Sequence, residues 1–167
     1  MIFANQDGIQ LAAVLELPDA KISYYALFAH CFTCGKDILA ATRIANTLAL
    51  NGVAVLRFDF TGLGDSQGDF SDTNFTSNVT DLVSAADFLR LNYQAPQLLI
   101  GHSLGGTAAL HAAGDISECK AVVTIGSPAN ADHLLHLFKQ DVETIQQNGV
   151  AIVDIAGRNF KIQKQFI

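Results

Sequence analysis

Short apolar runs alternate with longer segments of helical periodicity over most of the chain. The runs contain few polar positions, which is typical of strands buried on both faces of a sheet. They lie at residues 24–30, 53–59, 97–102 and 121–126. After each run, apolar residues recur at the spacing of one helical face. This periodicity predicts helices over residues 38–49, 75–89, 103–113 and 134–145.

Four β-α units in series, with connections long enough to hold a helix, predict a mainly parallel sheet with helices on both faces. An antiparallel N-terminal hairpin should extend one edge of this sheet. Residues 2–5 and 9–17 flank Asp7-Gly8, a dipeptide suited to a tight turn. The fold class is therefore α/β.

The end of the chain departs from this rhythm. Residues 150–155 and 160–166 flank a turn at 156–159 and predict a terminal β-hairpin. No linker, repeat or low-complexity segment marks an internal boundary, so we expect a single domain over residues 1–167. Within it, the helix and hairpin of residues 130–167 could form a cap.

The composition excludes several classes of protein. Of the 167 residues, 50% are hydrophobic and 16% are charged, against a typical charged share of about 25%, which excludes an intrinsically disordered chain. The 10 Lys and Arg against 16 Asp and Glu give a net charge of −6, so no basic patch for nucleic acid is evident and an anionic membrane attracts the chain little. We expect a small-molecule substrate, with no nucleic-acid or membrane partner.

Three features favour a cytoplasmic protein. The first residues lack the positive region and the apolar run of a signal peptide. The longest uncharged stretch, residues 91–114, is interrupted by polar residues and glycines and makes a poor membrane span. The 3 cysteines are an odd and sparse set, which implies no disulfide framework and fits a reducing compartment.

The most informative segment is Gly101-His102-Ser103-Leu104-Gly105, with a predicted strand before it and a helix after it. A serine on a sharp strand-to-helix turn adopts strained backbone angles and crowds the positions two residues away, where Gly101 and Gly105 leave room. Ser103 would stand near the positive end of a helix dipole. The pattern predicts a nucleophilic serine, and a serine that merely caps the helix is the alternative.

Acyl transfer also needs two N–H groups that stabilise a tetrahedral oxyanion. We expect one from the backbone of Leu104 and the second from Phe32, on the loop after the first parallel strand; an ordinary connector with a buried phenylalanine is the alternative. Residues 59–66 are glycine-rich and follow another strand, but they lack the residues of a phosphate-binding loop. They predict a tight turn that borders the pocket.

In order and spacing, the strand-end His30, the turn at 59–66 and the segment around Ser103 resemble the α/β-hydrolase superfamily. Residues 28–34, 57–64, 73–75 and 156–158 look like a bacterial subgroup in which the hydrolase domain is often fused to an OsmC-like peroxidase domain. The resemblance implies a serine hydrolase that acts on a small ester, amide or other acyl substrate and needs no cofactor or metal.

The resemblance also implies roles for the residues around the nucleophile elbow. Ser103 would be the nucleophile, and the backbone N–H groups of Leu104 and Phe32 would form the oxyanion hole. The supporting positions would be Gly101, His102, Gly105 and His30.

The departures from the superfamily bear on activity. Its members order the triad as nucleophile, acid and histidine, the last two on loops after two further strands. This chain stops at Ile167 before either strand, Cys31 replaces the usual glycine after the strand-end histidine, and no OsmC-like domain follows. We therefore expect residues 1–167 to be a C-terminally incomplete, truncated hydrolase domain that lacks its last strands and its catalytic acid and histidine.

A substitute base is one alternative to an incomplete site. His133 and His136, with Asp132 beside them, lie on the predicted helix after the fourth parallel strand. A helix face with an acidic residue near its start explains these residues as well. His111 is expected to point away from Ser103.

An incomplete sheet would leave the outer edge of the 121–126 strand unpaired. That edge could pair with a second copy of the chain, giving a homo-oligomer, or with the terminal hairpin.

Two other functions stay open. Cys31-Phe32-Thr33-Cys34 is a C-x-x-C between a strand and a helix, where thiol-redox proteins place their reactive pair. Zinc would need two further ligands, and only Cys119 remains among the cysteines. The hydrolase scaffold could also serve as a non-catalytic binding module.

Overall fold

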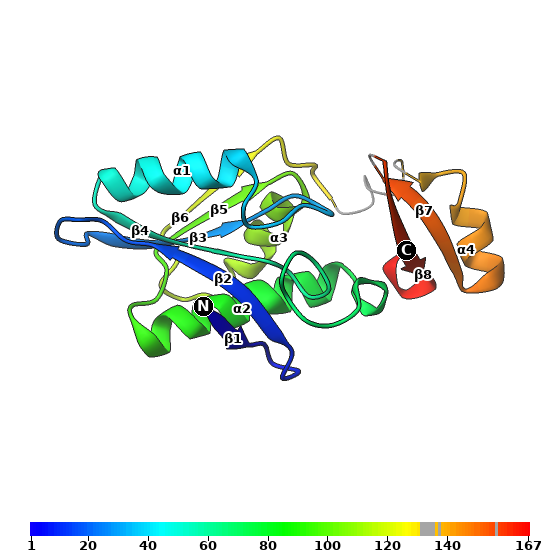
Figure 1. Ribbon diagram of the computed structural model, residues 1–167, viewed down its shortest axis with the longest axis horizontal. Coiled ribbons are helices and arrows are strands. Elements are labelled where there is room, and N and C mark those ends of the chain that lie inside the picture. Colours follow the sequence, from blue (N-terminus) through cyan, green and yellow to red (C-terminus); the bar gives the residue numbers. More distant parts are fainter. Residues whose placement is uncertain (131–135, 137, 156) are drawn as a thin grey trace.

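The computed structural model describes residues 1–130, 136, 138–155 and 157–167, and its main body is a sheet between two helical layers (Figure 1). Six strands pair in the order β1-β2-β4-β3-β5-β6. The four parallel strands are β3 (Tyr24–Ala29), β4 (Val53–Phe58), β5 (Leu98–His102) and β6 (Ala121–Ile125). Each lies within one residue of a predicted run, so the parallel sheet is confirmed.

The N-terminal hairpin also forms as predicted. Strands β1 (Ile2–Ala4) and β2 (Gln10–Glu16) pair antiparallel with each other. β2 then pairs antiparallel with β4, where Ala13 lies opposite Phe58. The hairpin therefore extends the sheet at the β4 side.

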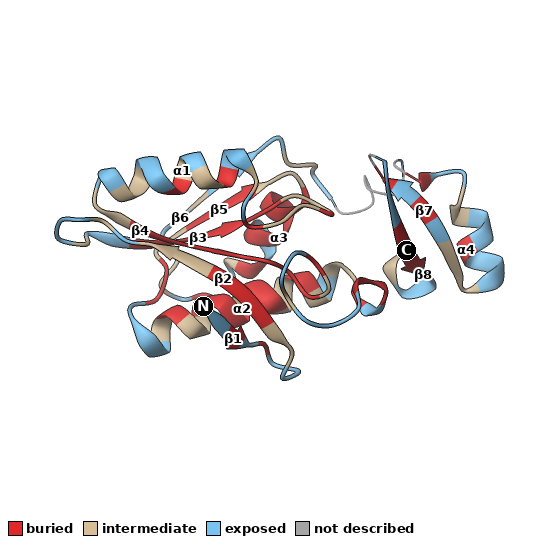
Figure 2. Cartoon of the chain, in the orientation of Figure 1, coloured by how far each residue is buried: buried red, intermediate tan, exposed pale blue. Residues whose placement is uncertain are grey.

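Helices cover both faces of the sheet. α1 (Leu39–Leu50) lies on one face, and α2 (Phe75–Asn92) and α3 (Leu104–Ala112) lie on the other (Figure 1). Alternation along β3 explains the two layers, because Ala26 and Phe28 pack with α1 residues while Leu27 belongs to the larger core cluster on the opposite face. The central strands are accordingly the most buried part of the sheet (Figure 2).

β6 ends the strand order and pairs only with β5 within the described residues. Its side chains are correspondingly open, since Val123 is 46% exposed and Ile125 is 37% exposed. The unpaired outer edge expected from the sequence is present.

The C-terminal residues form a small unit of their own. It contains α4 (Val142–Asn148), the antiparallel pair β7 (Val150–Ile155) and β8 (Arg158–Gln163), and the short 3₁₀ helix η3 (Lys164–Phe166). The terminal hairpin is confirmed, with a tighter turn than predicted because Ile155 pairs directly with Arg158. It forms a separate two-stranded sheet and does not pair with β6.

The fourth helix differs from its predicted range of 134–145. Its apolar positions Val142 and Ile145 are helical, but α4 begins only at Val142 and continues to Asn148, where Gly149 ends it with a φ of 79°. Leu134 and Leu135, the first positions of the predicted stripe, lie outside the described residues. No helix in the described ranges is long and apolar enough to cross a membrane.

Candidate active site

Ser103 lies between β5 and α3 in a backbone conformation that residues with a side chain rarely adopt. Its φ is 53° and its ψ is −126°, and its N–H donates to the carbonyl of Ile125 at 2.9 Å. Although Ser103 occupies the N-cap position of α3, its side chain makes no capping hydrogen bond. The sharp turn expected from the sequence is therefore confirmed, and helix capping does not explain the serine.

Close backbone contacts explain the two glycines that flank the turn. A Cβ at Gly101 would lie 2.3 Å from the carbonyl oxygen of Gly105. A Cβ at Gly105 would lie 2.3 Å from the carbonyl oxygen of His30, at the end of the neighbouring strand. Because real Cβ atoms do not approach backbone this closely, only glycine lets β3, β5 and α3 meet at this point.

The loop after β3 forms a tight turn beside this elbow. The N–H of Cys34 donates to the carbonyl of Cys31 at 3.0 Å. Within the turn, Thr33 has a φ of 61°, so it shares the left-handed region with Ser103. Phe32 is half-buried, and its ring packs against Phe70 with the centroids 5.5 Å apart.

The elbow and this loop enclose one small cavity. Phe32 and Leu104, the two residues predicted to donate N–H groups, both line it. The remaining lining residues are His30, Cys31, Phe60, Leu63, Phe70, Asn78, Gly105 and Ala108. The volume is about 10 Å³, which holds about one water molecule. Phe60 and Leu63 come from residues 59–66, so that turn borders the pocket as predicted.

The sequence matches a known family over most of this fold. The model of the family described as serine aminopeptidase S33 aligns with residues 29–155, which is more than half of the chain. The chain belongs to this α/β-hydrolase family. The match includes both the loop after β3 and the elbow at Ser103.

Relatives of this chain share its fold and part of its sequence. The chain is 39% identical over 106 residues to the human mitochondrial palmitoyl-protein thioesterase ABHD10, which covers 64% of this chain and 32% of the relative. An esterase domain from Rhodothermus marinus is 44% identical, with a TM-score of 0.72, over 99% of this chain and 64% of that one. Mouse alpha/beta hydrolase domain-containing protein 10 has a TM-score of 0.76 at 22% identity, which shows the fold alone. The chain spans about a third of the length of its curated relatives.

His30 lines the cavity and is fully buried. Its Nδ1 lies 2.8 Å from the carbonyl oxygen of Cys31, and the N–H of Phe60 donates to its Nε2 at 3.4 Å. These partners fit a neutral ring with its proton on Nδ1. Burial lowers the pKa of His30 below its ordinary value and outweighs the opposing effects of Cys31 and Asp59. The ring therefore joins the loop after β3 to the loop after β4.

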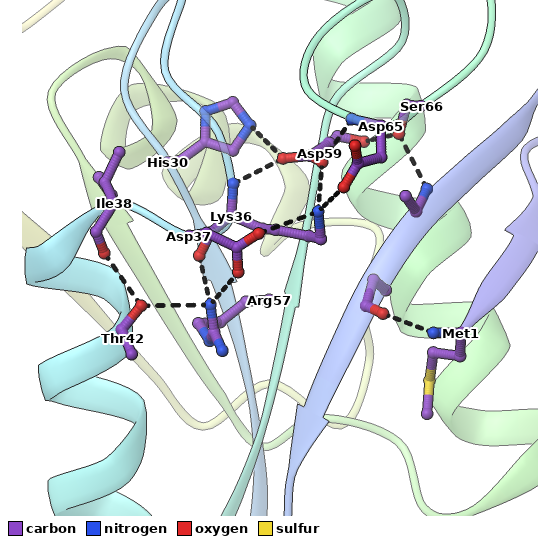
Figure 3. A network of polar contacts seen from close by, with 12 residues as sticks. Met1, His30, Lys36, Asp37, Ile38, Thr42, Arg57, Asp59, Asp65 and Ser66 are labelled. Carbon is purple, nitrogen blue, oxygen red and sulfur yellow. Dashed lines mark hydrogen bonds and ion pairs between the residues drawn. The ribbon is translucent and has the colours of Figure 1, made fainter.

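A buried ion pair, which sequence reasoning missed, joins the same two loops (Figure 3). The Asp59 carboxylate accepts from the Lys36 ammonium at 2.9 Å and from the Lys36 backbone N–H at 2.6 Å. The ammonium also donates to Asp65 at 2.6 Å and lies 3.1 Å from Asp37. Burial alone would lower the pKa of Lys36, but the hydrogen bonds to these carboxylates raise it above its ordinary value.

Cys31 and Cys34 form a disulfide that the sequence analysis did not predict. The turn explains the bond, because it brings the two Cα atoms to 5.3 Å, within the range for a disulfide. The bond closes a local turn and no wider framework, and Cys119 remains free. The described residues contain no group of three or more His, Cys, Asp or Glu side chains suited to a metal ion.

The C-terminal unit contacts the loop after β3 through a residue that sequence reasoning did not single out for a role. The Arg158 guanidinium, at the start of β8, donates to the carbonyl of Thr33 at 2.9 Å. Phe166 packs against Phe32 with the ring centroids 5.3 Å apart, and Phe160 packs against Phe70 at 5.5 Å. The predicted cap thus touches the loop that carries Phe32.

The other histidines occupy different surroundings. The Nδ1 of His102 is buried and has no hydrogen-bond partner in the described residues. His111 is exposed and lies edge-on against Phe75, away from the elbow as expected. His136 is exposed, while His133 and Asp132 lie outside the described residues. The two hydrogen bonds of the His30 ring go to Cys31 and Phe60, so neither reaches the Ser103 hydroxyl.

Proposed function

We propose that this chain carries the nucleophile and the oxyanion hole of a serine hydrolase that cleaves a small acyl ester or thioester. The observation that carries the proposal is the backbone of Ser103, which is held in a strained turn with its hydroxyl unused by the helix. Such strain persists only where the surrounding structure imposes it, and it concentrates at functional sites.

The proposed reaction uses three groups. The Ser103 oxygen attacks the acyl carbon as its proton passes to water, and the bond to the leaving oxygen or sulfur breaks as that atom takes up a proton. Water then hydrolyses the resulting acyl-serine and releases the carboxylic acid. The N–H groups of Leu104 and Phe32 stabilise the negative oxygen of the tetrahedral intermediate. Both residues line one cavity, which supports this pairing.

The substrate class is supported by two observations. The names of two relatives describe an esterase domain and a palmitoyl-protein thioesterase, so cleavage of an oxygen ester or a thioester fits the family. The cavity beside the two donors holds only about 10 Å³, which favours a small group next to the oxyanion hole.

We assign the catalytic acid and histidine to none of the described residues. His30 is buried between two backbone partners, and His111 lies at the far end of α3. A nucleophile without its base still gains from an oxyanion hole, which can leave roughly 10³–10⁴-fold acceleration over water. The chain by itself is therefore expected to be acylated slowly and to turn over ordinary esters poorly.

A fluorophosphonate probe tests the proposal, with the labelled residue identified by peptide mass mapping. We expect slow labelling at Ser103, no labelling of Ser103→Ala, and an unchanged rate for Ser117→Ala, since Ser117 is an exposed serine away from the elbow. The absence of labelling at Ser103 would contradict the proposal and favour a binding module. Labelling as fast as in complete serine hydrolases would contradict the incomplete site.

A further inference from the structure

The two residues on either side of Phe32 and Thr33 are covalently joined. Cys31 and Cys34 are each half-buried, so their disulfide is within reach of a small reagent. The turn between them holds Phe32, whose N–H we assign to the oxyanion hole. Its geometry therefore depends on whatever keeps the two cysteines together.

The turn is strained apart from the disulfide. Thr33 has a φ of 61°, a region that is unfavourable for a β-branched residue. The only hydrogen bond across the turn runs from the Cys34 N–H to the Cys31 carbonyl at 3.0 Å within the described residues. The net gain from one such bond is of the same order as the strain. The covalent link therefore adds to the contacts of Thr33 with Arg158 and of Phe32 with Phe70 and Phe166 in holding the turn.

Movement of this turn would change its contacts with His30 and the cavity and with Arg158 of the C-terminal unit. The Cys31 carbonyl is the partner of His30 Nδ1, and Cys31 itself lines the cavity. The Thr33 carbonyl accepts from Arg158 of the C-terminal unit. If Thr33 returns to an extended conformation, its carbonyl leaves Arg158 and the peptide groups around Phe32 rotate.

We propose that Cys31 and Cys34 form a dithiol–disulfide exchange site whose oxidation assembles the oxyanion hole and whose reduction takes it apart. This inference rests on the proposed function, because it acts through the N–H of Phe32. The reductant is a dithiol. Its thiolate attacks one cysteine sulfur, a mixed disulfide forms, and its second thiol closes a new disulfide. The protein S–S bond gains two electrons and two protons, and the dithiol is oxidised by the same amount.

The test compares Ser103 labelling in the two redox states. The chain is reduced with dithiothreitol, freed of it by gel filtration under argon, and treated with the fluorophosphonate probe beside the oxidised chain. Thiol titration of the unfolded chain should find Cys119 alone in the oxidised state and all three cysteines after reduction. Loss of an oxyanion donor typically costs about 10²–10³-fold in rate. We expect labelling of the reduced chain to be about 10²-fold slower and to recover on reoxidation.

Two variants locate the effect. Cys119→Ser keeps the disulfide pair and should retain the full difference between the two states. Cys34→Ala should label slowly in both states, and circular dichroism will show whether it and the reduced chain keep the fold. Equal labelling rates for the oxidised and reduced chains would overturn the inference and leave the proposed function intact. No labelling of Ser103 in either state would overturn the proposed function, and the inference with it.

Discussion

Ser103 and Thr33 carry side chains in backbone conformations that are usually left to glycine. Their φ values are 53° and 61°, and no other non-glycine residue in the described ranges has a positive φ. Such conformations cost on the order of 1–3 kcal/mol each. The two residues lie next to the two N–H groups that we assign to the oxyanion hole. The strain of the main chain is therefore concentrated at the proposed site, and the packing around it has to offset that cost.

The buried ring of His30 makes the stability of the chain depend on pH. Burial lowers its pKa in the folded chain, so the unfolded chain binds a proton below about pH 6.5 that the folded chain does not bind. Because the unfolded state then holds more protons, the free energy of unfolding falls as the pH drops from about 6.5 toward the folded-state pKa. The loss of free energy of unfolding that His30 causes is at most about 1.4 kcal/mol per pH unit. Urea unfolding between about pH 5 and 8 measures it.

Two variants separate His30 from the other titrating groups. His30→Asn should lose this part of the pH dependence, whereas His111→Gln, which changes an exposed residue, should keep it. If His30→Asn has the same slope as the parent chain over this range, the ring is not held neutral by burial.

Connections between elements, more than the elements themselves, bring the parts of the site together. Asp59 follows β4 and binds Lys36, which precedes α1. Arg158 begins β8 and binds the loop after β3. A disulfide closes that same loop. The β-α units supply a frame, and these polar contacts fix how the loops at its carboxyl edge lie against one another.

Asp59 and Asp65 bind the same ammonium and offer a matched pair of substitutions. The Asp59 side chain is 1% exposed and the Asp65 side chain is 78% exposed. Asp59→Asn removes one partner of a buried pair and should lower the free energy of unfolding by about 3 kcal/mol. Asp65→Asn should cost less than about 1 kcal/mol, because exposed ion pairs contribute little. Urea unfolding at pH 7 compares them, and equal losses would refute the structural role assigned to Asp59.

The sequence predicts what depends on neighbouring residues and misses what depends on distant ones. The four parallel strands follow from local apolar runs, and the turn at Ser103 follows from glycines two positions away on either side. The partnership of Lys36 with Asp59 spans 23 positions, and that of Arg158 with Thr33 spans 125. Neither a hydrophobic period nor a local motif predicts a contact between residues so far apart in the sequence. The spacing of Cys31 and Cys34, three positions apart, allows a disulfide. The turn that brings the two sulfurs together depends on the positive φ of Thr33, which the sequence does not predict.

The sheet as a whole ends in an exposed edge. β6 has one strand partner in the described residues, and Val123 and Ile125 are open beside α1. A row of free main-chain donors and acceptors invites pairing with another strand. Two copies related by a two-fold axis could pair their β6 strands antiparallel and continue the sheet from one molecule to the next.

We therefore expect the chain to self-associate in a concentration-dependent way in sedimentation velocity. Val123→Lys places a charge at the exposed edge and should shift the chain to the monomer. Ile2→Lys adds the same charge to an exposed position on β1, at the opposite edge, and should leave the association unchanged. Sedimentation as a monomer at all concentrations would contradict pairing through β6.

The hydrogen bond between Arg158 and Thr33 sets an order of events during synthesis. Translation adds about 5–20 residues per second, so the arginine emerges about 6–25 s after the threonine to which it donates, 125 positions earlier. Most of the sheet can collapse on the ribosome in that interval. The loop that we assign to oxyanion binding therefore gains its contact with Arg158 near the end of translation, after the strands of the main sheet have been synthesised.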